Sequence, residues 1–467
     1  MDAIDFIKEV ETKYDVESIK VKDMEVWPFL RIAYYFAYGD KYSSYIEQQK
    51  KTSFWTKIKR VKNVFYGFWN LFKKYDYLLF SDVLEIRWMN GRYVNKLAEF
   101  LISELGRKKV LLIENPAGGS HFERSKLSTK NTISLDFFLV FRYSPLLKRR
   151  VIINNETILR EINRKYDLDI NYRILISRFI RYKDLFRLFF RMYKPRLVFI
   201  SDYYNFIHQA AIHTAKKLGI RTIELQHGII NDKHPAYNVF IKVDKSFFPD
   251  YLFSFGNYVK NVFDDNSYFI KKDNILPIGS MYIDYINNEY KASEETIKMF
   301  SNLRKKYKRI VAVSSQETIE NKLIDFLKKS ASLSKHVLYI FVPRKVNRDY
   351  SNAIFPENII ILKDLDVYQI VKESNFHATV YSTCALEAPA LGVPNILINI
   401  DGMARKCYSD LLLNRDVTRF VDTEKEFVDV ILNWHTRMKK EIMNLHNVFY
   451  NQNHKESLRQ ALEIIGK

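Results

Sequence analysis

The feature that most constrains this chain is the repeated alternation of short apolar segments with helical segments. In the first half, helical stretches separate the apolar runs 76–81, 109–114, 135–141, 197–201 and 221–225. A second series follows, with the runs 251–255, 274–278, 309–314, 336–342, 358–362, 378–381 and 395–400. Strands that alternate with helices pair in parallel and need helices on both faces of their sheet. The sequence therefore predicts an α/β protein with two doubly wound, Rossmann-like domains.

This pattern divides the 467 residues into four parts. We expect an N-terminal helical extension over 1–74, a first Rossmann-like domain over 75–245, a second over 246–430, and a C-terminal helix and tail over 431–467. A single long charged helix is predicted at about 424–446. Ligands of doubly wound sheets bind beyond the carboxyl ends of the strands. We therefore expect the functional residues at strand ends, in a cleft between the two domains.

Charge and cysteine content narrow the class of protein. The chain has 74 Lys and Arg against 54 Asp and Glu, a formal net charge of +20. Such a surplus favours a polyanionic partner: nucleic acid, an acidic membrane or a phosphorylated substrate. Two cysteines, Cys384 and Cys407, cannot form a disulfide framework or a four-cysteine zinc site. The N-terminus is acidic, unlike a signal peptide, and no apolar run reaches the roughly 18–20 residues of a membrane span.

Residues 50–74 stand apart because they contain eight Lys or Arg and no Asp or Glu. Seven apolar residues recur there at helical spacing on one side: Trp55, Ile58, Val61, Phe65, Phe68, Trp69 and Phe72. A basic helix with an aromatic face can lie in a membrane interface. It can equally pack that face on the domain core and leave its lysines in solvent. The absence of acids makes the first interpretation stronger than such a stripe alone would. We predict that this segment binds anionic membranes, and core packing stays open as the alternative.

A histidine motif follows the strand expected at 221–225. The chain continues as Gln226-His227-Gly228, and His234 lies in the same loop. An imidazole titrates near neutrality, so His227 could accept a proton from a hydroxyl. His234 is a candidate second proton carrier or anion donor. The alternative is a loop histidine that is hydrogen-bonded to its own backbone.

A second motif follows the strand expected at 378–381. Ser382 and Thr383 precede a helix of small residues, and Glu387 lies about one turn into it. Amides at a helix N-terminus bind phosphate, the two hydroxyls add donors, and a carboxylate can accept from ribose hydroxyls. The alternative is an ordinary helix that is capped by Ser382.

Three further strand ends of the second series are candidates for the same site. Gly279 and Ser280 could present backbone amides, Gln316 could line a nucleotide pocket, and Arg344 with Lys345 could bind a diphosphate. A solvated loop is an equally good interpretation of the Arg-Lys pair.

Acidic residues also follow strands. Asp82 and Asp202 end strands of the first domain, where either could position an acceptor, act as a base or cap the next helix. The pair Asp364 and Asp366 resembles a site for a divalent cation, but its place before a helix favours capping. No metal site is expected.

Taken together, these motifs resemble those of GT-B glycosyltransferases of bacterial surface-polysaccharide biosynthesis. Segment 224–228, the later His-Pro-x-Tyr at 234–237 and the Trp-Pro-Phe-Leu-Arg at 27–31 resemble capsule and O-antigen transferases. Segments 279–284 and 382–394 are similar to donor motifs of teichoic-acid glycerophosphotransferases and UDP-sugar 2-epimerases.

The resemblance implies a nucleotide-sugar substrate and no metal or other cofactor. It implies that His227 is the general base on the acceptor hydroxyl or stabilises the leaving phosphate, with His234 and Asp202 as further catalytic candidates. The donor would be held on the second domain by Gly279, Ser280, Gln316, Arg344, Lys345, Ser382, Thr383 and Glu387. The acceptor would be held on the first domain by Asp82, Glu224, Gln226 and Tyr237. Thr379 stands eight residues before Glu387, where retaining enzymes have a second Glu, so the sequence favours inversion.

The leading hypothesis is a cytoplasmic glycosyltransferase, peripheral on the inner face of the cell membrane, that extends a lipid-linked capsule or O-antigen glycan. Residues 50–74 would contact the anionic membrane. A CDP-polyol phosphotransferase of the teichoic-acid type and a sugar-nucleotide epimerase are the enzymatic alternatives. A basic nucleic-acid-binding protein is the non-enzymatic one. Because no helix-turn-helix, zinc-finger or aromatic-glycine signature is present, we expect no nucleic-acid partner.

Overall fold

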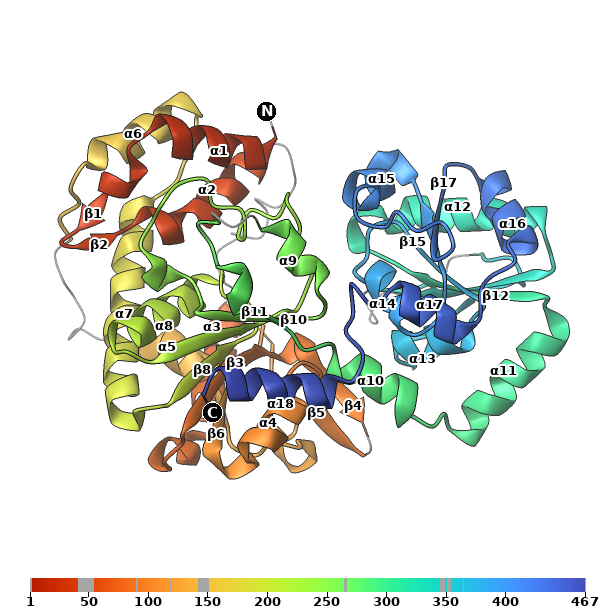
Figure 1. Ribbon diagram of the computed structural model, residues 1–467, viewed down its shortest axis with the longest axis horizontal. Coiled ribbons are helices and arrows are strands. Elements are labelled where there is room, and N and C mark those ends of the chain that lie inside the picture. Colours follow the sequence, from red (N-terminus) through yellow and green to blue (C-terminus); the bar gives the residue numbers. More distant parts are fainter. Residues whose placement is uncertain are drawn as a thin grey trace. The chain divides into compact units, whose positions relative to one another are not determined.

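The protein was analysed as a computed structural model (Figure 1). The structure describes residues 2–40, 54–89, 91–117, 119–141, 151–263, 267–344, 349–350, 354–363 and 365–466. The chain forms two compact units. The first comprises Met1–Ile278 together with Lys455–Lys467, and the second comprises Gly279–His454.

The first unit is built on a seven-stranded parallel sheet with the order β11-β10-β9-β8-β3-β6-β7. The strands are β3 (Tyr77–Asp82), β6 (Val110–Asn115), β7 (Thr132–Ser134), β8 (Leu197–Ile200), β9 (Arg221–Leu225), β10 (Tyr251–Ser254) and β11 (Ile275–Pro277). Their side chains are buried on both faces of the sheet, which explains why the strands read as continuous apolar runs.

Helices cover both faces of this sheet. The helices of this unit include α4 (Glu99–Leu105), α5 (Asp136–Phe141), α6 (Glu156–Lys165), α7 (Tyr172–Tyr193), α8 (Phe206–Lys217), α9 (Tyr258–Val262) and α18 (His454–Ile464). Leu458 and Leu462 of α18 join the core cluster that contains Leu101 and Ile102 of α4. On the opposite face, Phe186 of α7 packs edge-on against Phe80 of β3. The C-terminal helix therefore completes the first unit.

The N-terminal helices α1 (Ala3–Lys13) and α2 (Trp27–Asp40) also belong to the first unit. A short antiparallel ribbon, β1 (Lys20–Val21) and β2 (Met24–Glu25), connects them. Phe29 of α2 stacks on Phe179 of α7 with ring centroids 3.9 Å apart. The N-terminal helices are thus packed on the helices that cover the sheet. This differs from the separate extension that was expected over 1–74.

A buried carboxylate joins α1, α2 and a distant loop. Glu11 of α1 accepts hydrogen bonds from the indole of Trp27 at 2.9 Å, from Nε of Arg31 at 2.7 Å and from the amide of Phe240 at 2.9 Å. The side chains of Glu11 and Arg31 are both almost fully buried. A buried charge is tolerable only when it is paired and hydrogen-bonded, and this pair meets both conditions.

Arg31 also contacts the loop that contains residues 234–238. Its guanidinium donates to the carbonyl oxygens of Pro235 at 2.5 Å and of Asn238 at 2.6 Å. The carbonyl of Ala236, between them, accepts from the Tyr203 hydroxyl. The Trp-Pro-Phe-Leu-Arg segment and the His-Pro-x-Tyr segment, about 200 residues apart in sequence, are therefore in direct contact.

The second unit is built on a six-stranded parallel sheet with the order β14-β13-β12-β15-β16-β17. Its strands are β12 (Arg309–Ser314), β13 (Val337–Val342), β14 (Ile359–Ile361), β15 (Phe376–Thr379), β16 (Asn395–Ile398) and β17 (Thr418–Val421). Its helices are α10 (Met281–Asn288), α11 (Glu294–Lys306), α12 (Glu320–Leu333), α13 (Val367–Glu373), α14 (Cys384–Ala390), α15 (Met403–Tyr408), α16 (Glu424–Asn433) and α17 (Lys439–Leu445).

The predicted architecture of two doubly wound parallel-sheet domains is confirmed, with the first boundary moved. Strands β10 and β11 were assigned to the second series, but β10 pairs with β9, with Leu252 opposite Glu224, and β11 pairs with β10. The first unit therefore extends to Ile278 and not to 245. The final segment, 455–467, returns to the first unit instead of forming a separate tail.

Three local predictions were wrong. Segment 135–141 is the helix α5, because a short apolar run fits a buried strand and a buried helix equally well. Segment 92–105, one of the stretches between apolar runs and expected to be helical throughout, begins as strand β5 (Arg92–Asn95), paired with β4 (Ile86–Met89), before α4 starts. The single helix expected at 424–446 is two helices. The break falls at Trp434, whose backbone is extended and whose ring stacks on Phe376.

In the described part of the chain, none of the helices is long and apolar enough to cross a membrane.

The buried pair of Glu11 and Arg31 gives a stability prediction. Arg31→Met should lower the free energy of unfolding by about 3–5 kcal/mol, because it leaves the Glu11 carboxylate buried without its counter-charge. Urea unfolding followed by tryptophan fluorescence measures the change. The double variant Glu11→Gln/Arg31→Met removes both charges and should recover part of the loss. A loss below about 1 kcal/mol in the single variant, the range of exposed pairs, would contradict this account.

Candidate active site

Polar residues gather at the carboxyl edge of the first sheet, around its topological switch point. The chain begins the sheet at β3, adds β6 and β7 on one side, and then returns to place β8 and later strands on the other. The switch point therefore lies between β3 and β8, where ligands of doubly wound sheets bind. Asp82 ends β3 and Asp202 closely follows β8, so these two predicted residues flank this position.

The two aspartates are held differently. Asp82 accepts from the Leu84 amide at 2.8 Å and from the Asn115 side chain at 2.8 Å. Burial raises its pKa, and the nearby charge of Asp202 adds to the effect. Asp82 thus caps the following turn, as one interpretation expected, and also faces the switch point.

Asp202 forms a dyad with a histidine that sequence reasoning missed. Nδ1 of His208, in the first turn of α8, lies 2.7 Å from Oδ1 of Asp202. Burial lowers the pKa of His208, but the charge and hydrogen bonds of Asp202 outweigh it and the net shift is upward. Nε2 of His208 is buried and has no partner within the protein. The helical pattern alone did not distinguish His208. The signal in the sequence was its place in the first turn of the helix that follows the strand-end acid Asp202.

His227 lies beyond the end of β9, next to another missed residue. Its Nε2 is 3.2 Å from the hydroxyl of Tyr204, and its Nδ1 is buried without a hydrogen-bond partner in the protein. Burial raises the pKa of Tyr204, which therefore stays a neutral phenol near pH 7. The structure brings His227 and His234 together around this phenol, with the ring centroids of Tyr204 and His234 5.2 Å apart.

His234 itself is uncharged at neutral pH. Burial lowers its pKa to about 4, and the neighbouring His227 contributes in the same direction. Its Nδ1 accepts from the Ala236 amide at 3.3 Å. Because Nδ1 accepts, the neutral ring carries its proton on Nε2 and can still donate a hydrogen bond there. The role of His234 as a second proton carrier or anion donor therefore stays a prediction.

Glu224 and Tyr237, predicted to bind an acceptor, lie beneath the edge of the sheet. Glu224 is fully buried, and its Oε1 accepts from the Tyr237 hydroxyl at 2.8 Å and from the Tyr203 amide at 3.2 Å. Burial raises the pKa of Glu224 to about 8. Tyr237 is also buried. These contacts hold the loop of His234 from below.

Gln226 links the ends of two neighbouring strands. Its amide nitrogen donates to the carbonyl of Gly228 at 2.8 Å and to the Tyr258 hydroxyl at 3.1 Å. Its amide oxygen accepts from the Phe255 backbone at 2.7 Å. Because both ends of the amide are occupied by protein groups, Gln226 positions the turn that carries His227.

A further pair at the end of β6 was missed as well. Oε1 of Glu114 lies 2.5 Å from Nδ1 of His121, and both side chains are almost fully buried. Tyr66 stacks on the His121 ring at 4.0 Å. The other polar atom of each, Oε2 and Nε2, has no partner in the protein. The sequence did not indicate this pair, because His121 does not follow any of the predicted strands directly.

The second sheet has its switch point between β12 and β15, since the chain begins at β12 and adds strands on both sides. Gln316 follows β12, and both of its amide atoms are buried without a hydrogen-bond partner among the residues that the structure describes. Glu387 lies in the first turn of α14, after β15, and its Oε2 is buried and without a partner too. Two residues predicted to bind a donor thus present unsatisfied polar atoms at the ends of the two strands that flank this switch point.

The thiol of Cys384 lies between these strand ends. Burial raises its pKa to about 12, and the adjacent Glu387 carboxylate adds to the rise. The N-cap of α14 is Thr383, which makes no side-chain capping bond, so the expected capping by Ser382 is not seen. The Ser382 hydroxyl oxygen instead accepts from the Cys384 amide at 3.3 Å, at the start of the helix. Thr383 is exposed.

The remaining residues that were predicted to bind the donor do not gather at the switch point. Gly279 has φ +77°, and an added Cβ would lie 2.3 Å from the Asn451 carbonyl oxygen, so close backbone packing requires this glycine. Ser280 caps α10. Arg344 is exposed after the end of β13, and Lys345 lies outside the described residues.

One residue of the acidic pair in the second unit, Asp366, behaves as a cap. Asp366 caps α13 by accepting from the Tyr368 amide at 3.0 Å, and Asp364 lies outside the described residues. Among the residues that the structure describes, no group of three His, Cys, Asp or Glu side chains is arranged to hold a metal ion.

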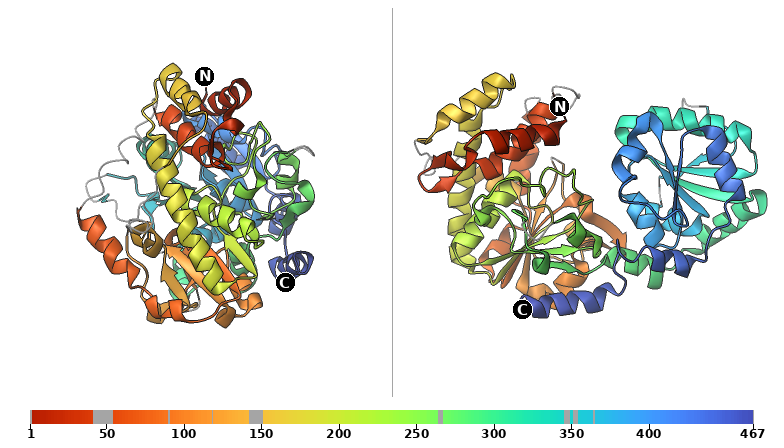
Figure 2. Two further views of the ribbon diagram at one scale, coloured as in Figure 1. Left: turned by 90° about the vertical axis from the view of Figure 1, so that its left-hand side faces the viewer. Right: turned by 45° about the horizontal axis from the view of Figure 1, so that its top comes forward.

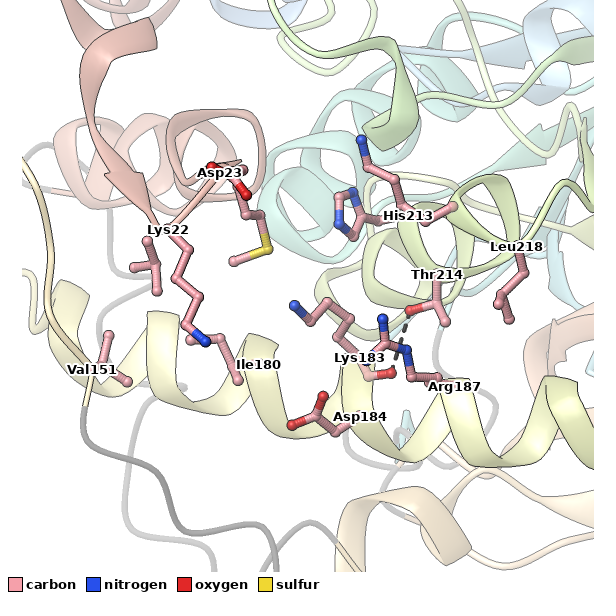
Figure 3. A pocket seen from close by; sticks show the side chains of 13 residues that line it. Lys22, Asp23, Val151, Ile180, Lys183, Asp184, Arg187, His213, Thr214 and Leu218 are labelled. Atoms are coloured by element: carbon pink, nitrogen blue, oxygen red, sulfur yellow. Dashed lines mark hydrogen bonds between the residues drawn. The ribbon is translucent and has the colours of Figure 1, made fainter.

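A cavity of about 590 Å³ lies in the first unit, apart from the strand ends (Figure 3). It is enclosed by the turn between β1 and β2, by α7 and by α8, and none of the sequence-predicted site residues lines it. Lys22, Lys183 and Arg187 bring positive charge to it, and Asp23 and Asp184 bring negative charge.

No protein-family model and no curated protein matches the sequence. Solved structures are similar in fold. A glycosyltransferase of kitacinnamycin is 10% identical, with a TM-score of 0.51 over 84% of this chain and 98% of its own. The UDP-GlcNAc 2-epimerase of Methanocaldococcus jannaschii is 14% identical, with a TM-score of 0.50 over 83% of this chain and 99% of its own. The chain therefore has the GT-B fold, in which two Rossmann-like parallel-sheet domains follow each other.

The raised pKa of Glu224 predicts a pH dependence of stability. The folded protein keeps this proton up to a pH of about 8, whereas the unfolded chain releases it near 4.5. The stabilisation is complete below about pH 4.5 and is lost as the pH rises towards 8. Urea unfolding at about pH 5 and pH 8 should show the wild type losing several kcal/mol relative to Glu224→Gln, because one pKa unit corresponds to about 1.4 kcal/mol. Equal losses in the two proteins would contradict a buried, protonated Glu224.

Proposed function

We propose that this protein is a glycosyltransferase that moves a sugar from a nucleotide-sugar donor to a growing, lipid-linked bacterial surface glycan of the capsule or O-antigen type. The observation that carries the proposal is the set of buried, unpartnered polar atoms of Gln316 and Glu387 at the switch point of the second sheet. A buried polar group without a hydrogen bond costs about 1–3 kcal/mol. Such groups at a ligand-binding edge indicate partners that a substrate supplies.

The second unit would hold the nucleotide. The Glu387 carboxylate can accept from ribose hydroxyls, and the Gln316 amide can donate to and accept from a base or sugar. The hydroxyls of Ser382 and Thr383 and the exposed guanidinium of Arg344 are suited to the diphosphate.

The first unit would supply the base. As the new bond forms between the acceptor oxygen and the anomeric carbon, the bond to the diphosphate breaks, and the acceptor proton passes to His227. Tyr204 engages one ring nitrogen of His227 and so fixes its orientation. A single displacement of this kind inverts the anomeric centre. The His208–Asp202 dyad lies at the switch point of the same sheet and is the second candidate base.

Two other reactions suit the same groups. A CDP-polyol phosphotransferase would use the same nucleotide contacts and a histidine base. A sugar-nucleotide epimerase is favoured by the fold similarity to the M. jannaschii UDP-GlcNAc 2-epimerase. An epimerase changes its nucleotide sugar without an acceptor, so the requirement for an acceptor separates it from both transferases.

The test begins with thermal unfolding in the presence of UDP, CDP, CMP, GDP or TDP. A ligand that binds only the folded protein raises Tm by mass action, so the proper nucleotide should stand out. The matching nucleotide sugar is then incubated with and without an oligosaccharide acceptor. Transfer that requires the acceptor supports the proposal. Epimerised sugar without an acceptor, transfer of a polyol phosphate, or no stabilisation by any of the nucleotides would overturn it.

Loss of His227 should affect turnover and not donor binding. His227→Ala should lower kcat by about 10²–10⁴-fold, the usual contribution of general acid–base catalysis, and should keep the Tm shift that the nucleotide produces. The exposed His435 provides a matched control, since His435→Ala should leave kcat unchanged. Near-normal turnover of His227→Ala would remove it from the mechanism and direct attention to His208.

Loss of Glu387 should affect donor binding. Glu387→Ala should weaken nucleotide binding by about 1.5–3 kcal/mol, the range for a hydrogen bond to a charged group. Isothermal titration measures the Kd, and the exposed Glu357 supplies the control variant Glu357→Ala. If Glu387→Ala fails to fold, the carboxylate has a structural role. If it folds and binds the nucleotide normally, the carboxylate does not hold the donor.

A further inference from the structure

The segment 54–74 is fixed to the first unit by its polar residues. It consists of helix α3 (Phe54–Val64) and the short helix η3 (Phe68–Phe72). Asn63 donates to Asp136 at 2.8 Å and to the Gly119 carbonyl at 3.1 Å. Asn70 donates to the carbonyls of Lys130 at 2.9 Å and Thr132 at 3.1 Å. These bonds attach the segment to the rest of the first unit at two points, one in α3 and one in η3.

The turn between the two helices is fixed as closely. Gly67 has φ +68°, and a Cβ at this position would collide with the Thr132 carbonyl oxygen. Tyr66 donates to the Phe122 carbonyl at 3.0 Å, and Val64 is buried. The segment therefore has a defined inner side, made mainly of amide groups and a glycine.

The aromatic residues lie on the outside. We name Trp55, Phe65, Trp69 and Phe72 the aromatic face; their side chains are between 69% and 75% exposed. This excludes the interpretation in which the aromatic stripe packs on the domain core. In the left view of Figure 2, α3 is the orange-red helix on the outer side of the first unit. Large aromatic side chains gathered at a surface mark an interaction site.

The charged side chains that the segment itself contributes have one sign. Lys59, Lys62 and Lys74 are exposed, and residues 50–74 contain no Asp or Glu. Arg60 lies 3.9 Å from Asp136 of α5, an acid on the packed side of the segment. The segment therefore exposes apolar rings together with lysine side chains.

Helix α7 continues this surface. The hydroxyl of Tyr193, in its last turn, donates to the Leu71 carbonyl at 2.5 Å, which places the end of α7 beside η3. The same end of α7 exposes Leu188 and Met192, with Arg191 between them. Two elements thus bring apolar and basic residues to neighbouring positions.

We infer that the aromatic face and the lysines around it dock the first unit onto an anionic lipid surface. Aromatic rings insert at the level of the lipid headgroups, and lysines are attracted to anionic lipids. A protein partner would need an acidic, apolar surface, and a second copy of this strongly basic chain would be repelled. A lipid surface satisfies both the rings and the charge. The inference concerns a surface apart from the strand ends and holds whichever reaction the protein catalyses.

The test is flotation of the full chain with vesicles of phosphatidylcholine alone, or of phosphatidylcholine and phosphatidylglycerol in equal parts, at low and high salt. We expect binding to the anionic vesicles, weakened by salt, and little binding to the neutral ones. Trp55 and Trp69 should report insertion by a blue shift of tryptophan emission. A wild-type protein that ignores anionic vesicles overturns the inference.

Two variants separate the contributions. Lys59→Gln/Lys62→Gln/Lys74→Gln should lower vesicle affinity by roughly 100-fold, since each basic residue near such a surface contributes a factor of about five. Trp69→Ser/Phe72→Ser should lower it by roughly tenfold or more, because two rings no longer enter the interface. Both variants should keep the wild-type Tm, because the side chains removed are exposed.

Matched changes in the second unit provide the controls. Lys298→Gln/Lys305→Gln/Lys306→Gln removes the same charge from exposed positions, and Ile297→Ser/Leu413→Ser removes two exposed apolar side chains. Both should bind vesicles as the wild type does. Equal losses in these controls would show attraction by net charge alone and overturn the inference. Concentration-dependent self-association that Trp69→Ser/Phe72→Ser abolishes, without vesicle binding, would assign the face to a second copy and overturn it too.

Discussion

Parallel pairing of buried strands is the constraint from which the rest of this structure follows. Because both faces of each sheet are covered, the strands are mostly apolar, and the polar residues within them, such as His377 and Asn395, are buried and hydrogen-bonded to each other. The polar residues of the candidate site lie at the carboxyl edge, where the loops begin. Loops on this edge diverge at the topological switch point, where strands are added on opposite sides of the first strand. Asp82 and Asp202 flank that position in the first unit, and Gln316 and Ser382 flank it in the second. Two sheets of similar construction thus present two different sets of groups, one of acids and histidines and one of an amide, hydroxyls and the carboxylate of Glu387.

Loops beyond a parallel sheet lack a strand ladder to hold them, and this protein holds the loop of His234 by buried charge. Arg31 donates to two of its carbonyls and is itself held by Glu11. From below, Tyr237 of the same loop donates to Glu224. The resemblance noted in the Trp-Pro-Phe-Leu-Arg and His-Pro-x-Tyr segments has its physical basis in this contact. The guanidinium of Arg31 in the first segment donates hydrogen bonds to backbone carbonyls in and next to the second.

The sequence predicted the strand and helix alternation, because burial on both faces produces apolar runs that need no partner to be recognised. It could not assign β10 and β11 to a sheet, since pairing with β9 depends on residues far away in the chain. It placed His227, Gln316 and Glu387 at strand ends correctly, yet it could not tell that Glu224 and Gln226 face inward. His208 was hidden because its helix pattern is ordinary and only Asp202 makes it unusual. Side-chain direction at a strand end is set by tertiary contacts, which a pattern of residue types does not contain.

The segment 54–74 reverses the usual arrangement of an amphipathic helix. Most surface helices bury their apolar side and turn polar groups to water, because burial of apolar area is the main gain of folding. Here Asn63, Gly67 and Asn70 make the contacts with the body, and the rings of Trp55, Trp69 and Phe72 remain outside. Hydrogen bonds, a close backbone contact and the stacking of Tyr66 on His121 hold the segment without the four rings of the aromatic face. The apolar area that folding leaves exposed is therefore available to an external apolar phase, and the lysines beside it select an anionic one.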